Sequence, residues 1–238
     1  MPAPEAYVQW INDHLGFNPR SQKNSDALSD FVLADLRAGC PALERALDSG
    51  RLRPRKNINV KTKVVERNVD LVIQDMHDQP DVVLPGPVVA FSIAVEHKTI
   101  MTAHGKARKN RYGDIIAYSN HMHNHWRDCI AAAIVVINTS LAYQNPDAFA
   151  KDLVRPQFKM DKIVKATSAI FAGIPLRDSS EDPSDQPEAL AVIVVDYDGA
   201  NPATLITDER APQIGEPHHY DSFLNRICEL YDRRFPIR

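Results

Sequence analysis

The chain has 238 residues, of which 44% are hydrophobic and 25% are charged, and its formal net charge is −3 at pH 7. These values are ordinary for a soluble globular protein and exclude a nucleic-acid binder that is basic overall. No apolar run reaches the ~18 residues of a membrane helix. The first residues lack the basic start and apolar stretch of a signal peptide. We therefore expect a single domain, residues 1–238, with no membrane partner.

Three cysteines are spread along the chain, at Cys40, Cys129 and Cys228. Their number is odd, and their spacing matches no zinc-binding pattern. Disulfides persist in oxidising compartments and are rare in the cytoplasm. We expect a reduced, cytoplasmic protein with no disulfide framework and no cysteine-based zinc site.

The first part of the chain, residues 1–56, is predicted to be an N-terminal helical segment in front of a core at 57–238. Helix-capping residues at 25–30 precede apolar residues at helical spacing. Gly39 and Pro41 predict a break within this helical stretch.

Three strand-like segments come next. Residues 58–64 alternate between apolar and polar side chains, as a half-exposed strand does, and residues 69–73 form a second apolar run. The turn-rich stretch 75–87 separates them from a continuous apolar run at 88–99, which predicts a strand covered on both faces. We expect the second and third segments to form an antiparallel hairpin.

Helices and strands alternate in the rest of the chain. We expect helices at 105–126, 158–174 and 220–235, and strands at 130–137 and 189–197. The stretch 177–188 is acidic and contains two prolines, which indicates a mobile loop. Alternating helices and strands imply parallel neighbours. Together with the hairpin they predict an α/β fold with a mixed β-sheet flanked by helices.

The triplet Glu96-His97-Lys98 stands at the end of the apolar run. Residues two apart share one face of a strand, so the Glu96 carboxylate and the Lys98 ammonium point to the same side. Burying two opposite charges at the end of a strand costs free energy, so we expect these groups to serve a function. A carboxylate that holds a divalent metal, beside an ammonium that steers a water or a phosphate, is typical of phosphodiester hydrolysis.

A hairpin between the two strands would bring Asp70 beside Glu96. Two converging carboxylates repel each other unless a cation neutralises them. Mg²⁺ suits such a site because it prefers oxygen ligands and keeps several waters, and Lys98 could position a water or stabilise the transition state. Asp75 and Asp81 are the alternatives to Asp70, although Asp81 would lie near the hairpin tip.

Asp70, a hairpin-length gap, the triplet and a basic helix together resemble the PD-(D/E)XK nuclease superfamily, whose best-known members are restriction endonucleases. The resemblance covers roughly residues 58–197, and it departs from the pattern where Val69, not proline, precedes Asp70. It implies a restriction-endonuclease-like fold with Asp70, Glu96 and Lys98 as catalytic residues. Asp70, Glu96 and the backbone carbonyl of His97 would bind Mg²⁺, with Mn²⁺ as a substitute.

Basic residues cluster before and after this acidic centre. They are either solvated surface residues or contacts to nucleic-acid phosphates, and we expect phosphate contacts. The candidates are Lys61, Lys63, Lys106, Lys109 and Arg111.

Two further carboxylates are candidates for a supporting role. Glu66 could be a second-metal or supporting acid, or a surface carboxylate in an ion pair. Asp114 could orient Lys98 or a water, or serve only on the surface.

Histidines gather at 121–125. His121 and His125 are four residues apart on the expected helix, a spacing that can bind zinc, but no further ligand follows at a suitable spacing. A structural role near the helix C-terminus explains them better, and contact with DNA is the main alternative.

These features favour a Mg²⁺-dependent endonuclease of double-stranded DNA, a sequence-specific type II restriction enzyme. Symmetric cleavage of two strands predicts a homodimer. The chain lacks the phosphate-binding motif of nucleotide hydrolases, so we expect no nucleotide cofactor. The alternatives are a repair or junction-resolving nuclease of the same superfamily, a non-catalytic DNA-binding scaffold, and a histidine-based metal hydrolase.

Overall fold

The structure is a computed structural model, which describes the chain except for residues 19–20, 77–87, 89, 142, 144–159 and 237–238. Its helices are α1 (Ala3–Asp13), α2 (Gln22–Gly39), α3 (Pro41–Asp48), α4 (His104–His125), α5 (Met160–Ala172) and α6 (Tyr220–Arg234). Its strands are β1 (Leu52–Lys61), β2 (Glu66–Asp75), β3 (Phe91–Ile100), β4 (Ile130–Asn138), β5 (Ala189–Asp196) and β6 (Thr204–Leu205). The expected N-terminal helices and the break between Gly39 and Pro41 are confirmed.

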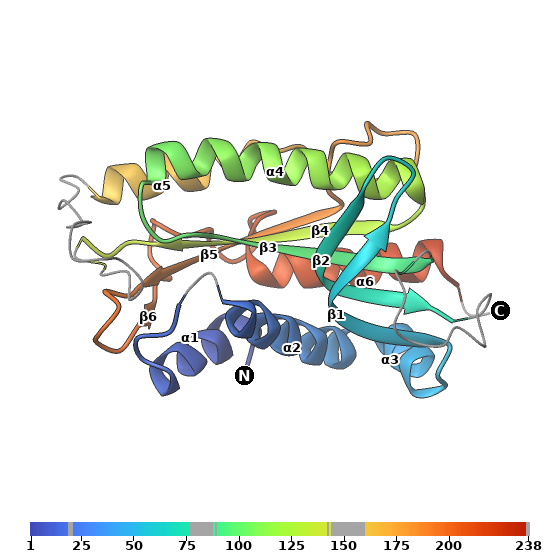
Figure 1. Ribbon diagram of the computed structural model, residues 1–238, viewed down its shortest axis with the longest axis horizontal. Helices are drawn as coiled ribbons and strands as arrows, with labels where there is room; N and C mark the ends of the chain where they lie inside the picture. The colour runs from blue at the N-terminus through green and yellow to red at the C-terminus, as the bar shows by residue number, and fades with distance from the viewer. Residues whose placement is uncertain (19–20, 77–87, 89, 142, 144–159, 237–238) are drawn as a thin grey trace.

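One mixed sheet runs through the molecule in the order β1-β2-β3-β4-β5-β6. The β1–β2 and β2–β3 pairs are antiparallel, β3–β4 and β4–β5 are parallel, and β5–β6 is antiparallel. Figure 1 shows α4 and α5 on one face of the sheet and α1, α2, α3 and α6 on the other. The predicted α/β architecture, a mixed sheet flanked by helices, is therefore confirmed.

The first strand begins earlier than the alternation at 58–64 predicted. β1 starts at Leu52 and carries mostly exposed or half-buried side chains, with Pro54 in its first half. β1 is an edge strand, where proline and charged residues are tolerated. The apolar residues of β1 are therefore too few to show in the sequence at which residue the strand begins.

The expectation of a chain without disulfides is wrong. Cys40, between α2 and α3, is bonded to Cys228 on α6, and their Cα atoms lie 5.2 Å apart. Packing of helices distant in sequence brings these residues together, which their spacing could not indicate. Cys129 is buried and free.

The stretch 177–188 is not the mobile loop that its composition indicated. Arg177 is 1% exposed and Glu188 is fully buried, and they form an ion pair of 3.2 Å. The Arg177 guanidinium also donates to the Ser180 carbonyl at 2.9 Å. Buried charge, not apolar contact, holds this segment against the sheet.

None of the helices in the described part of the chain combines the length and the hydrophobicity that crossing a bilayer requires.

Candidate active site

Strands β2 and β3 part in the middle of the sheet. Their pairing runs from Gln74 opposite Phe91 to Leu71 opposite Val95 and stops there, whereas β3 stays paired with β4 as far as Ile100. Asp70 and Glu96 are the next residues on the two separating strands. The split therefore places these two residues at neighbouring register positions, and the Asp70 charge raises the pKa of the Glu96 carboxyl.

The Asp70 carboxylate bridges the split. Its Oδ2 accepts a hydrogen bond from the backbone N–H of His97 at 2.7 Å, and its Oδ1 accepts one from the Ser25 hydroxyl on α2. The Ser29 hydroxyl donates to the backbone carbonyl of Asp70 at 3.2 Å. Asp70 thus takes the place of a backbone partner for β3 and joins α2 to the sheet.

The Glu96 side chain is only 4% exposed and is surrounded by cations. The Lys98 ammonium donates to Glu96 Oε1, and the Arg67 guanidinium lies 3.5 Å from the same oxygen. Burial raises the pKa of the Glu96 carboxyl and outweighs the lowering effect of Lys98 and Arg67, while the nearby Asp70 charge adds to the rise. A further cation bound next to this buried carboxylate would stabilise its ionised form.

Arg67, which the motif does not include, has a defined place in the site. Its guanidinium lies 5.5 Å from the centre of the Tyr118 ring on α4, in cation–π geometry. It also donates to the Asp114 carbonyl at 3.5 Å. Arg67 therefore links β2, α4 and Glu96, a connection that only the fold reveals.

The buried His97 side chain lies in a hollow of about 340 Å³ with Ser25, Asp70, Lys98 and Arg111. Burial lowers the pKa of its imidazole. In a strand, the N–H and the C=O of one residue point to the same edge. Since the His97 N–H points at Asp70, the His97 carbonyl also faces the split.

The oxygen atoms at the split suit a hard divalent cation. Asp70, Glu96 and the His97 carbonyl would supply oxygen ligands of the kind that Mg²⁺ prefers, with waters completing its coordination. Within the described residues no group of three His, Cys, Asp or Glu side chains could hold a metal ion. The donor set fits Mg²⁺ in chemistry, but the protein would contribute only part of the coordination shell.

The other aspartates do not share the place of Asp70. Asp75 ends β2 opposite Leu52, at the far end of the paired segment from Glu96. Asp81 lies outside the described residues. Asp70 is the described aspartate that meets Glu96.

The supporting carboxylates stand apart from the two central ones. Glu66 is exposed at the start of β2. Asp114 forms an ion pair of 2.8 Å with Arg111, which agrees with the surface role that was one of its two expected alternatives. In the described part of the chain, neither side chain forms a hydrogen bond or an ion pair with Asp70 or Glu96.

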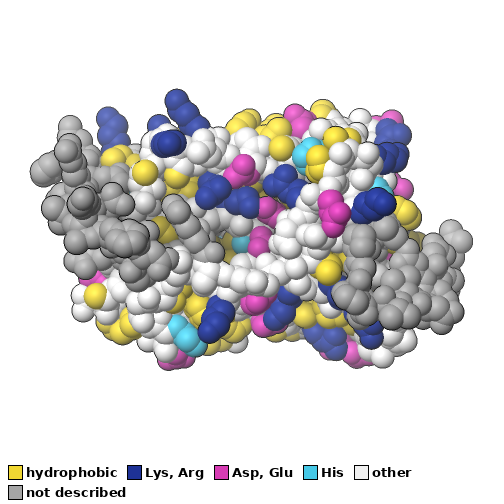
Figure 2. Space-filling model, viewed as in Figure 1, with side chains coloured by type: hydrophobic (Ala, Val, Ile, Leu, Met, Phe, Trp, Pro, Cys, Tyr) yellow, Lys and Arg dark blue, Asp and Glu magenta, His cyan; other side chains and the backbone are white. Residues whose placement is uncertain are grey.

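The candidate phosphate-binding residues lie on two elements beside the site. Lys106 and Lys109 are exposed near the start of α4, where Arg111 also lies, and Lys61 and Lys63 are exposed at the turn between β1 and β2. Figure 2 shows a hollow in the middle of the face viewed, with acidic, basic and histidine side chains inside it and further basic side chains around it. This distribution suits an anionic partner seated over buried carboxylates.

The histidine cluster has a structural role. His123 is buried, with Nδ1 2.8 Å from the Ser184 carbonyl and Nε2 2.8 Å from the Glu188 carboxylate. His121 and His125 belong to no metal-binding group among the residues that the structure describes. The structure therefore favours the structural interpretation of this cluster over a zinc site.

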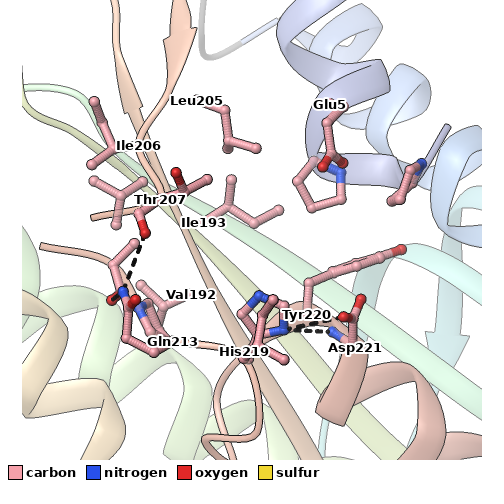
Figure 3. A pocket seen from close by; sticks show the side chains of 16 residues that line it. Glu5, Val192, Ile193, Leu205, Ile206, Thr207, Gln213, His219, Tyr220 and Asp221 are labelled. Carbon is pink, nitrogen blue, oxygen red and sulfur yellow. Dashed lines mark hydrogen bonds and ion pairs between the residues drawn. The ribbon is translucent and has the colours of Figure 1, made fainter. Parts of the chain in front are cut away.

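A larger hollow of about 430 Å³ lies at the other end of the sheet, between α1, β5, β6 and the start of α6. Figure 3 shows that its walls include Ile193, Leu205 and Ile206. The polar groups at its rim serve local structure, since His219 Nδ1 accepts from the Asp221 N–H and caps α6. It offers no counterpart to the carboxylate pair at the split.

Comparison with protein-family models, curated protein sequences and solved structures finds no match to this chain. The fold and the site define an α/β domain with Asp70 and Glu96 at a strand split and an ion pair between Lys98 and Glu96.

The buried charge of Glu96 gives a testable effect on stability. Because the pKa of Glu96 is higher in the folded than in the unfolded chain, the folded state binds more protons between the two values, and stability falls as pH rises through them. We expect Glu96→Gln to raise the melting temperature at pH 7, and the difference to vanish below about pH 4, where the carboxyl is neutral in both states. Thermal melts over this pH range test it, with the exposed Glu44→Gln as control. A lower melting temperature of Glu96→Gln at pH 7 would contradict the prediction.

Proposed function

We propose that the chain is a Mg²⁺-dependent endonuclease of double-stranded DNA, of the PD-(D/E)XK type that its motif resembles. One observation carries the proposal: Asp70 and Glu96 are the first residues beyond the point where β2 and β3 part, the Asp70 charge acts on Glu96, and Lys98 is bound to Glu96. A carboxylate pair with an adjoining ammonium suits metal-assisted hydrolysis of a phosphodiester.

Each residue of this site has a separate task in the proposed reaction. Asp70, Glu96 and the His97 carbonyl would hold Mg²⁺, which polarises the phosphate and acidifies a bound water. Lys98 orients the attacking water and stabilises the negative charge that develops on the phosphate. Lys98 and Arg67 lie against the Glu96 carboxylate and lower its pKa, against the larger opposing effect of burial. Asp70 is held in place by Ser25 and the His97 N–H.

The surface around the site supports DNA as the substrate. Exposed lysines on α4 and at the β1–β2 turn flank the carboxylates, and contacts of this kind fix a protein on a duplex without reading its sequence. Cleavage of both strands in a symmetric manner calls for a homodimer, which places one site on each strand.

Incubation with plasmid and phage DNA in the presence of Mg²⁺ tests the function. We expect discrete fragments, since the proposal is a sequence-specific enzyme, and no fragments when a chelator removes the metal. A smear would indicate a nonspecific nuclease. Absence of cleavage with both Mg²⁺ and Mn²⁺ on varied DNA would contradict the proposal.

A specific observation favours a second candidate, a non-catalytic DNA-binding scaffold. Both carboxylates already have protein partners, because Asp70 is bound by Ser25 and His97, and Glu96 by Lys98 and Arg67. Titration calorimetry with Mg²⁺ separates the two candidates. If the chain is a nuclease, it binds Mg²⁺ through Glu96, and this binding is lost in Glu96→Gln. If the chain is a scaffold, calorimetry detects no Mg²⁺ binding, and the affinity for DNA is the same with and without Mg²⁺.

A further inference from the structure

The hairpin of β1 and β2 continues past the point where β2 leaves β3. The β1–β2 pairing extends to Lys61 opposite Glu66, whereas the β2–β3 pairing ends at Leu71. The last part of the hairpin, residues 59–68, therefore has no strand of the sheet beyond β2, and on its β1 side Val88 forms backbone hydrogen bonds with Asn59 and Lys61. Figure 1 shows it twisting away from the sheet toward α4. We call residues 59–68 the hairpin end.

The turn of the hairpin end is held rigid by one threonine. The Thr62 hydroxyl donates to the Val65 carbonyl at 2.6 Å and accepts from the Val65 N–H at 3.0 Å. The Thr62 N–H also donates to the Val65 carbonyl, at 3.0 Å. A turn with this many internal bonds presents its side chains in a fixed geometry at little cost in conformational entropy.

Two apolar side chains stand on this rigid turn. Val64 is 69% exposed and Val65 is 38% exposed, and Lys61 and Lys63, which precede them in the chain, are exposed as well. Two branched apolar side chains at an exposed tip, next to two lysines, contribute little to the stability of the fold. They suit a partner surface that is negatively charged and offers small apolar groups.

The hairpin end is also connected to the carboxylates. Arg67, adjacent to the last paired residue Glu66, lies 3.5 Å from the Glu96 carboxylate. A partner that seats on the hairpin end would therefore be positioned next to the strand split. The hairpin end and the proposed active site face the same ligand.

We propose that the hairpin end enters the major groove of duplex DNA, with Val64 and Val65 against the methyl groups of thymine and Lys61 and Lys63 on the flanking phosphates. This inference rests on the proposed function, because it takes DNA as the substrate. The major groove is about 12 Å wide and admits a two-stranded ribbon, and the thymine methyl is the apolar group displayed there. Phosphates supply the negative charge that the two lysines require.

Replacing thymine by deoxyuridine tests the apolar contact without altering the protein. Fluorescence anisotropy would measure the affinity of the full chain for a random-sequence duplex pool, in Ca²⁺ to prevent cleavage, with thymine or with deoxyuridine throughout. We expect the methyl-free pool to bind about three- to fifteenfold more weakly, the loss for burying one or two methyl groups. The double variant Val64→Ser with Val65→Ser should bind both pools equally, at the weaker level.

The two lysines of the hairpin end are tested separately, by the salt dependence of DNA binding. Lys61→Ala and Lys63→Ala should each lower the slope of log affinity against log salt concentration by about 0.9, one phosphate contact per lysine. Ile214→Ser is the matched control, because Ile214 is 84% exposed but lies in the hollow at the other end of the sheet. It should leave both pools and the salt slope unchanged.

The outcomes separate this inference from the proposed nuclease. DNA binding that depends on thymine methyls and on the valines supports the hairpin contact even if no cleavage is ever found. Cleavage with equal affinity for both pools overturns the hairpin contact and leaves the nuclease intact. Failure of the chain to bind either pool overturns the hairpin contact outright.

Discussion

Glu96→Gln and Lys98→Gln are each expected to lower the rate of Mg²⁺-dependent DNA cleavage by about 10²- to 10³-fold or more, the usual loss when one group that stabilises developing charge is removed. Glu96 carries the only carboxylate on the β3 side of the described site, and Lys98 is the ammonium bound to it. DNA binding should survive both changes, because the phosphate contacts lie on α4 and the hairpin end. Initial rates on a cleaved plasmid and anisotropy on the same sequence give the two readouts.

A matched control makes this result specific to the site. Glu44→Gln removes an exposed carboxylate on α3 and should leave the cleavage rate unchanged. Circular dichroism confirms that each variant is folded. Full activity in either Glu96→Gln or Lys98→Gln, with normal DNA binding, would eliminate the proposed catalytic centre.

Much of the sheet could be predicted from the sequence because its central strands are covered on both faces. β3, β4 and β5 are continuous apolar runs whose side chains are almost all buried, and such runs are distinctive. β1 was located less well because an edge strand carries charged residues without penalty. The end of the apolar run in β3 also predicts that the triplet Glu96-His97-Lys98 lies near the end of this strand.

The meeting of Asp70 with Glu96 followed from hairpin geometry alone, because antiparallel strands place residues at equal distances from the turn beside each other. The partners of these carboxylates could not be predicted in the same way. Ser25 reaches Asp70 from α2, and Arg67 reaches both Glu96 and Tyr118. Such contacts depend on how helices pack against the sheet, which no local pattern encodes. The Cys40–Cys228 bond was missed for the same reason.

A second group of buried charges, centred on Glu188, explains why the stretch 177–188 is ordered. Glu188 Oε1 accepts from Arg177 at 3.2 Å and from Arg234 at 2.8 Å. Its Oε2 lies 2.8 Å from His123 Nε2 and accepts from the Ala131 N–H at 2.9 Å. The carboxylate thereby joins α4, β4 and α6. Composition alone indicated a mobile loop because it does not show that Arg177 pairs with Glu188, or that residues distant in sequence, His123 and Arg234, also bind this carboxylate.

Removal of the Glu188 carboxylate is expected to lower the free energy of unfolding by about 3–5 kcal/mol, the usual cost of leaving a buried charge without its partner. In Glu188→Ala, Arg177 stays 1% exposed with no compensating anion. Denaturant unfolding followed by circular dichroism measures the loss. Arg37→Ala is the matched control, because it breaks the exposed pair between Arg37 and Asp48 and should cost at most about 1 kcal/mol.

The dependence of this stability on pH gives a second test. Burial alone would raise the pKa of Glu188, but the hydrogen bonds and charges of His123 and Arg234 outweigh it, so the pKa lies below its ordinary value. The Glu188 charge therefore adds stability above about pH 4.3, the ordinary value of a glutamate, and that stability is lost as pH falls through the lower folded-state value. Glu188→Gln should unfold more easily than the native chain at pH 7 and lose less stability on acidification. Equal stabilities at pH 7 would show that the buried cluster does not hold the segment in place.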